Sequence, residues 1–116
     1  MVVEKKCLLV DNEDDLNKIL KSKDGIIALV YASWCPFCRK FLPIFMQYAE
    51  KEGRYFLRIE DDQENIGDKY AVNVFPTVLF FEKGVVAKRL DGKPGVGLSE
   101  KELADFIELC PLPEKG

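Results

Sequence analysis

The sequence predicts an α/β fold with a central mixed β-sheet, helices on both faces of the sheet and a closing antiparallel hairpin. Short apolar runs of strand length alternate along the chain with segments in which apolar residues recur every three or four positions. The last two strand-like runs are separated only by Glu82-Lys83-Gly84, which is a tight-turn sequence. The resulting order of elements, β-α-β-α-β-α-β-β-α, is typical of an α/β domain.

The first half of the chain predicts two strands and two helices. Cys7–Val10 is a short apolar run, and Asp11–Lys23 follows it with helical spacing and acidic residues in the first turn. Ile26–Ala32 is apolar throughout, as expected for a central strand that is buried on both faces. Pro36–Glu52 then predicts a helix, with aromatic residues along one side.

The second half predicts three strands and a short helix. Tyr55–Ile59 is a strand-like run, and Glu64–Tyr70 has a weak helical pattern. Thr77–Phe81 and Val85–Leu90 are the two arms of the predicted hairpin.

The last helix has the clearest boundaries. Ser99 is a favourable N-cap, Glu102 completes a capping box, and Pro111 ends the helix. We therefore expect residues 1–110 to form a single domain and residues 111–116 to form a short C-terminal tail.

Composition excludes several function classes. The chain has 116 residues, 47% hydrophobic and 32% charged, with a formal net charge of −3. It has no Lys/Arg-rich block, so we expect it to bind neither nucleic acid nor membrane. We also expect a monomer. Met1–Lys6 lacks the apolar core of a secretory signal, which predicts a cytoplasmic location; a mature secreted protein whose signal has been removed would show the same pattern.

Cysteine is the residue best suited to covalent chemistry here. The chain contains no histidine, which excludes Cys–His and Ser–His–Asp mechanisms and any His-ligated metal. Its four cysteines are too few for a disulfide framework. Cys7 and Cys110 have no partner at metal-binding spacing, so we expect both to be inert buried thiols and expect no metal site.

Cys35 and Cys38 lie where a predicted strand turns into a predicted helix. Backbone N–H groups at the start of a helix favour a thiolate over a thiol at Cys35. Such a thiolate can attack a foreign disulfide, and a second thiol three positions later can then release it. The pair therefore predicts thiol–disulfide exchange.

Several landmarks together resemble the thioredoxin family over nearly the whole chain. They are Trp34-Cys35-Pro36-Phe37-Cys38, a proline five residues after the second cysteine (Pro43), Val74-Phe75-Pro76-Thr77, the Phe81–Gly84 turn and the closing helix. Any single landmark would be weak, whereas the joint pattern is specific.

The resemblance implies a thioredoxin fold in which Cys35 is the attacking nucleophile and Cys38 the resolving thiol. It also implies that Pro76 is a cis proline facing the cysteines, with Phe75 backbone groups available to pair with an extended substrate. The residues expected to bind substrate surround the pair: Trp34, Pro36, Phe37, Phe75 and Pro76.

The buried acid of the family is missing from this sequence. Leu29 occupies the position of the family's usual aspartate, six residues before the nucleophile, and Arg58 aligns with the lysine that normally partners it. An unpaired buried charge is costly, so we expect Arg58 to turn toward solvent or to find another partner.

Two further departures concern the surface around the cysteines. Pro36-Phe37 is closer to the Pro-Tyr of glutaredoxin than to the Gly-Pro of common thioredoxins, which leaves the redox potential open. The segment Asp91–Gly97 is longer and richer in glycine than the family pattern, and Gly95 and Gly97 are candidates for its substrate-facing surface. By contrast, we expect Glu60-Asp61-Asp62 to be a solvated loop.

By resemblance, we expect a cytoplasmic protein-disulfide reductant that needs no cofactor besides the cysteine pair. Its partners would be disulfide-containing client proteins and an NADPH-dependent thioredoxin reductase. Two alternatives stay open: a glutathione-coupled, glutaredoxin-like enzyme, and a thioredoxin-fold binding module without turnover.

Overall fold

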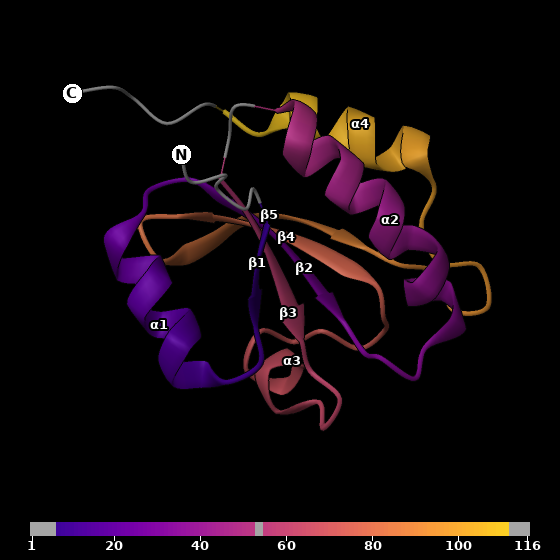
Figure 1. The fold of residues 1–116 in the computed structure, drawn as a ribbon, viewed down its shortest axis with the longest axis horizontal. Helices are drawn as coiled ribbons and strands as arrows, with labels where there is room; N and C mark the ends of the chain where they lie inside the picture. The colour runs from indigo at the N-terminus through magenta and orange to yellow at the C-terminus, as the bar shows by residue number, and fades with distance from the viewer. Residues whose placement is uncertain (1–6, 53–54, 112–116) are drawn as a thin grey trace, which may run out of the picture.

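The computed structural model describes residues 7–52 and 55–111 of the chain (Figure 1). Within them the predicted order of elements is confirmed: β1 (Cys7–Val10), α1 (Glu13–Ser22), β2 (Ile26–Tyr31), α2 (Pro36–Lys51), β3 (Tyr55–Glu60), α3 (Asn65–Lys69), β4 (Thr77–Glu82), β5 (Val85–Asp91) and α4 (Glu100–Leu109). Met1–Lys6 and all but the first residue of the predicted tail lie outside the described residues.

The five strands form one mixed sheet in the order β1-β3-β2-β4-β5. Strands β1, β3 and β2 are parallel, whereas β4 is antiparallel to β2 and β5 is antiparallel to β4. Every residue of the central strand β2 is buried, as its uniformly apolar sequence predicts. The predicted mixed sheet and closing hairpin are therefore confirmed.

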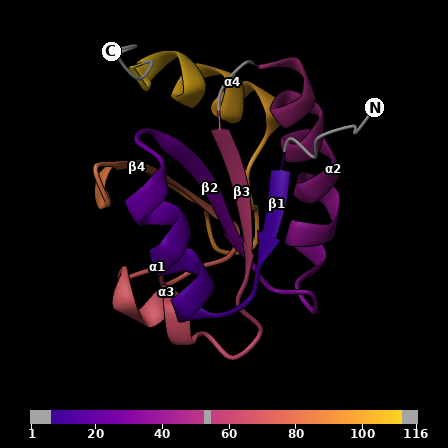
Figure 2. The ribbon, with the colours of Figure 1, turned by 60° about the vertical axis from the view of Figure 1, so that its left-hand side comes forward.

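Helices cover both faces of this sheet. Figure 2 shows α1 and α3 on one side of the strands and α2 on the other, and Figure 1 shows α4 beside α2. Each face has its own apolar core, one with side chains from α2 and α4 and one with side chains from α1 and α3. Six aromatic residues are buried in these cores: Tyr31, Phe41, Phe45, Phe56, Phe80 and Phe81. None of the described helices has both the length and the apolar character needed to cross a membrane.

Several observed boundaries differ from the predicted ones by one or two residues. Helix α1 begins at Glu13 because Asn12 caps it, with its side-chain oxygen accepting the Asp15 N–H at 2.8 Å. Strand β2 ends at Tyr31, one residue before the predicted end. Helix α3 begins only at Asn65, since Glu64 has a left-handed backbone with φ 63°.

The capping box of α4 is confirmed. The Glu102 N–H donates to the Ser99 hydroxyl at 3.2 Å, and the Glu102 carboxylate accepts the Ser99 N–H at 3.0 Å. Lys93 adds an ion pair to the same carboxylate at 2.6 Å. That lysine, together with the Ser99 hydrogen bonds, lowers the pKa of Glu102. The start of α4 is thus fixed to the segment that follows β5.

Candidate functional site

The antiparallel pairing of β2 with β4 brings the two halves of the site together. Val30 and Thr77 are partners in this register, so the residues that follow β2 and those that precede β4 meet at the same end of these two strands. Cys35 lies on the first side and Phe75 on the second. The Cys35 thiol donates to the Phe75 carbonyl oxygen with an Sγ–O distance of 3.8 Å.

Cys35 is the N-cap residue of α2, with extended backbone angles and proline in the first turn that follows. Its carbonyl oxygen accepts the N–H groups of Cys38 and Arg39, both at 3.1 Å. The residue is only 5% exposed. The predicted placement at a strand–helix junction is confirmed, and the sulfur lies where the helix begins.

Cys38 lies one turn further along the helix and is 1% exposed. The pKa of its thiol is raised to about 12: burial is the largest cause, a hydrogen bond with the Ala32 backbone opposes it, and the nearby Cys35 sulfur adds to it. At neutral pH Cys38 is therefore a protonated thiol, which must lose its proton before it can attack a disulfide.

Trp34 lies on the surface beside Cys35 and is 53% exposed. Its indole N–H donates to the Asp62 carbonyl oxygen at 3.1 Å, and its ring centroid lies 5.9 Å from that of Phe75. The two rings form an apolar wall next to the sulfur, at the place expected for substrate contact.

Asp62 fixes the turn before the nucleophile, although its segment was expected to be a solvated loop. Its carboxylate accepts the Ser33 N–H at 2.7 Å and the Ser33 hydroxyl at 2.6 Å, and these bonds lower the pKa of Asp62. Tyr31 and Glu60 pair in the β2–β3 register, so the residues two positions beyond each of them also meet. That register was the signal that could have identified the contact.

The neighbouring Asp61 is buried, whereas it was expected to lie in a solvated loop. It is 4% exposed, and its carboxylate accepts the N–H groups of Ile66 and Gly67 at 3.1 and 2.5 Å. It therefore ties the start of α3 to the end of β3.

The Phe75–Pro76 peptide bond is cis, as the resemblance implied. Gly92, which sequence reasoning missed, lies directly behind it. A Cβ atom at Gly92 would clash with the Pro76 carbonyl oxygen, so no side chain fits at this position. The close approach of these two backbones holds the chain after β5 against the proline.

The residues between the cysteines differ in their surroundings. Pro36 is exposed, whereas Phe37 is half-buried against the segment after β5. Gly97 is buried there with φ +84°, and a Cβ atom on it would lie 3.0 Å from the Phe37 Cβ. Gly97 therefore faces Phe37 rather than a substrate surface, which corrects the expectation. Gly95 is exposed, and a Cβ atom on it would have no neighbouring atom of the described residues within 4 Å.

Leu29 is fully buried on the same face of the sheet as both cysteines. Arg58 is its register partner on β3 and is half-buried. Its Nε atom is buried and has no hydrogen-bond partner among residues 7–52 and 55–111. The expected turn toward solvent is thus only partial. The Arg58 charge lowers the pKa of the Tyr31 hydroxyl and of the Cys7 thiol, in both cases against the larger effect of burial, which raises it. The Tyr31 hydroxyl also donates to the Glu60 carboxylate at 3.1 Å.

Cys7 and Cys110 are both buried as predicted, 7% and 3% exposed, and their inertness stays a prediction. Burial raises the pKa of Cys7 to about 11, an effect that the Arg58 charge partly opposes. The described part of the chain contains no cluster of three or more His, Cys, Asp or Glu side chains arranged to hold a metal.

Comparisons with known proteins agree with this geometry. The Thioredoxin family model matches residues 7–108. Thioredoxin of Mycoplasmoides gallisepticum is 32% identical over 85 residues, which cover 72% of this chain and 85% of that protein. Protein disulfide-isomerase A5 of Bos taurus is 34% identical over 111 residues, covering 90% of this chain. The chain spans only 21% of that longer relative.

A solved structure shows the same fold. It is a mutant of thioredoxin from Halobacterium salinarum NRC-1, with a TM-score of 0.77 and 24% sequence identity. The superposition covers 98% of this chain and all of the other.

The two sulfurs are expected to differ in reactivity toward an alkylating reagent. Near pH 8 iodoacetamide should modify Cys35 at least about tenfold faster than Cys38, because the raised pKa of Cys38 keeps it protonated. Timed quenching followed by peptide mass spectrometry measures both rates in the reduced protein, with Cys7 and Cys110 as buried internal controls. Equal rates at Cys35 and Cys38 would contradict the assignment of their roles.

The missing buried acid is expected to slow the resolving step. Leu29→Asp places a carboxylate on the face that carries Cys38, where it can accept the thiol proton, so release of reduced substrate near neutral pH should be about tenfold faster. Rapid-mixing measurements on a preformed mixed disulfide give this rate, and Leu29→Asn is the uncharged control. Equal rates in the wild type and Leu29→Asp would show that the missing acid has no kinetic consequence.

Proposed function

This chain belongs to the thioredoxin family of thiol–disulfide oxidoreductases, and from that premise we propose that it reduces disulfide bonds in other proteins. One observation carries the proposal: the Cys35 sulfur lies at the start of α2, 3.8 Å from the Phe75 carbonyl oxygen and beside the cis Pro76. A nucleophile is thereby placed next to backbone groups that can hold an extended polypeptide.

In the first step the Cys35 thiolate attacks one sulfur of the client disulfide. The client S–S bond breaks, a new S–S bond joins Cys35 to the client, and the other client sulfur leaves as a thiolate that takes up a proton. The client segment pairs with the Phe75 backbone while Trp34 covers its side chains. Both residues were expected at the substrate surface, and their positions fit that role.

In the second step Cys38 loses its proton and attacks the Cys35 sulfur. The mixed disulfide breaks, the second client sulfur leaves as a thiolate, and Cys35 and Cys38 remain joined by a disulfide. Two electrons have then passed from the protein to the client. With Leu29 in place of an acid, water is our candidate acceptor for the Cys38 proton.

Each turnover consumes the dithiol, so the proposal includes an external reductant. We assign this role to an NADPH-dependent thioredoxin reductase and place the protein in the cytoplasm, where thiols are kept reduced. A disulfide between residues three apart closes a small ring and gains little from loop closure, so it should be easy to reduce. The proposal requires no cofactor besides the cysteine pair.

Replacement of the resolving thiol tests the proposal directly. In a Cys38→Ser variant the mixed disulfide cannot be released, so disulfide-linked complexes with client proteins should accumulate and disappear on addition of dithiothreitol. Non-reducing electrophoresis followed by mass spectrometry identifies them, and Cys35→Ser/Cys38→Ser is the matched control. The binding-module alternative gains if neither variant forms disulfide-linked species.

The reductant is identified by a side-by-side assay of the oxidised protein. We expect thioredoxin reductase with NADPH to reduce Cys35–Cys38 at least about tenfold faster than millimolar glutathione does, since only Pro36-Phe37 favours the glutaredoxin alternative. NADPH consumption follows the first reaction, and the second is coupled to glutathione reductase. Faster reduction by glutathione would favour the glutaredoxin-like enzyme.

A further inference from the structure

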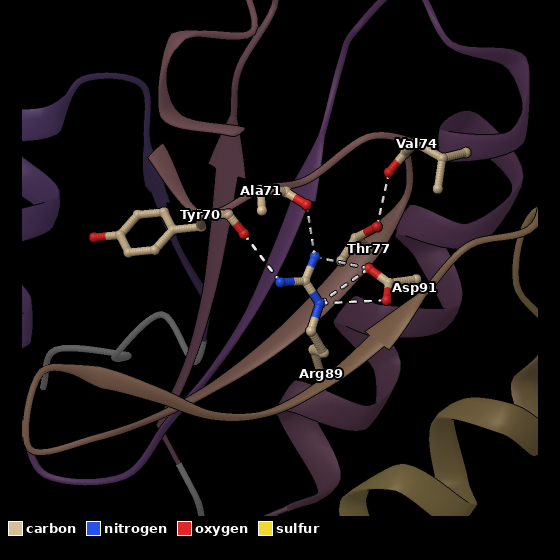
Figure 3. Close-up of polar contacts among 6 residues, drawn as sticks. All are labelled: Tyr70, Ala71, Val74, Thr77, Arg89 and Asp91. Atoms are coloured by element: carbon tan, nitrogen blue, oxygen red, sulfur yellow. Dashed lines mark hydrogen bonds and ion pairs between the residues drawn. The ribbon is translucent and has the colours of Figure 1, made fainter. Parts of the chain in front are cut away.

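Arg89 joins the edge strand β5 to the turn that follows α3 (Figure 3). Its guanidinium donates to the backbone carbonyl oxygens of Tyr70 and Ala71, at 3.0 Å each. It also donates to the Asp91 carboxylate, with a shortest distance of 2.9 Å. The rigid fork of five donors in arginine suits such a set of acceptors, whereas a lysine could not span it.

The turn that Arg89 contacts depends on partners outside the helix. The last carbonyl groups of a helix have no partner within it, and Arg89 supplies donors to two carbonyl groups at this end. Ala71 has φ 58°, a left-handed conformation that is unfavourable for alanine. The Tyr70 ring packs edge-on against Phe81 with centroids 5.3 Å apart, which fixes the same turn against the sheet.

The opposite end of the following loop is anchored at the start of β4, which pairs with β5 next to Arg89. Asp91, the carboxylate partner of Arg89, is the register partner of Thr77. The Thr77 hydroxyl donates to the Val74 carbonyl oxygen at 2.7 Å (Figure 3). Residues 72–76 are therefore held between the turn bound by Arg89 and the start of β4.

The anchored loop carries the backbone that faces the reactive sulfur. The Phe75 carbonyl oxygen lies 3.8 Å from the Cys35 Sγ, and Pro76 follows it. Arg89 itself is on the α3 side of the sheet, since its register partner Leu79 packs in the core formed with α1 and α3. It therefore acts on the loop without touching either cysteine.

We propose that Arg89 is a positioning residue for client binding: by holding the Tyr70 and Ala71 carbonyl groups it sets loop 72–76 in the position from which the Phe75 backbone pairs with a client. This role rests on the proposed function. An exposed ion pair alone would contribute little, but here the Arg89–Asp91 pair is combined with two carbonyl hydrogen bonds.

Two kinds of substrate should respond differently to the loss of Arg89. A protein disulfide needs the Phe75 backbone for pairing, whereas a small aromatic disulfide such as dithiodipyridine needs only the Cys35 sulfur. Loss of Arg89 should therefore weaken the first reaction and leave the second unchanged. The equilibrium potential of the cysteine pair should also stay the same.

Arg89→Met and Arg89→Lys test this, with Lys88→Met as the matched control. Lys88 is the adjacent exposed cation on β5, and its register partner Phe80 packs in the other core. We expect Arg89→Met to raise KM for insulin reduction about tenfold, equivalent to about 1.4 kcal/mol, with kcat for the same reaction and the rate with dithiodipyridine within about twofold of wild type. The KM of Arg89→Lys for insulin reduction should lie between those of the wild type and Arg89→Met, and the KM of Lys88→Met should match that of the wild type.

Amide hydrogen exchange provides a readout that does not depend on activity. Exchange of the Val72 amide, which donates to the Gly67 carbonyl oxygen at 2.8 Å, should be about tenfold faster in Arg89→Met than in Lys88→Met, because the loop loses its anchor. Unchanged exchange, an unchanged KM, or equal slowing with both substrates would each overturn the role of Arg89. Should the wild type reduce neither disulfide, the proposed function would fail, and the exchange comparison would still decide whether Arg89 holds the loop.

Discussion

The antiparallel pairing of β2 with β4 at the centre of the sheet is the constraint on which the site depends. Residues before Cys35 and residues after Pro76 are far apart in sequence, yet the register of Val30 with Thr77 holds them together where β2 ends and β4 begins. Because every side chain of β2 is buried, a slip of this register would expose apolar surface on one face or the other. Core packing thus fixes which ends of the two strands meet, and with them the segments that lead to Cys35 and Phe75.

The chemistry depends on an asymmetry between two sulfurs one helical turn apart. Cys35 lies at the helix start beside the surface formed by Trp34, whereas Cys38 is enclosed by the core and stays protonated at neutral pH. In this chain Leu29 and the half-buried Arg58 are register partners on β2 and β3. Neither of these two positions carries a carboxylate. Removal of the Cys38 proton is therefore the step that the surrounding side chains of the described residues assist least.

The order of elements and the placement of the cysteines could be predicted because they depend on local patterns. Apolar periodicity indicated the strands and helices, and the capping box indicated the start of α4. Contacts between distant segments could not be predicted in the same way. Asp62 binds Ser33 only because β2 and β3 are in register, and Gly92 is required only because the backbone of Pro76 approaches it. The sequence pattern predicts for Arg89 only an exposed cation on a strand, because its partners Tyr70 and Ala71 are distant in sequence.

The contact of Phe37 with Gly97 limits what can be learned by transplanting redox motifs between relatives. In this chain the aromatic ring fills the space above a glycine whose own backbone conformation excludes a compensating side chain. A chimera that carries a dipeptide without an aromatic residue, such as Gly-Pro, between Cys35 and Cys38 would leave that space empty and remove one contact of the segment after β5. Any difference in reactivity would then combine an electronic effect with a packing defect, so the dipeptide and its supporting segment should be exchanged together.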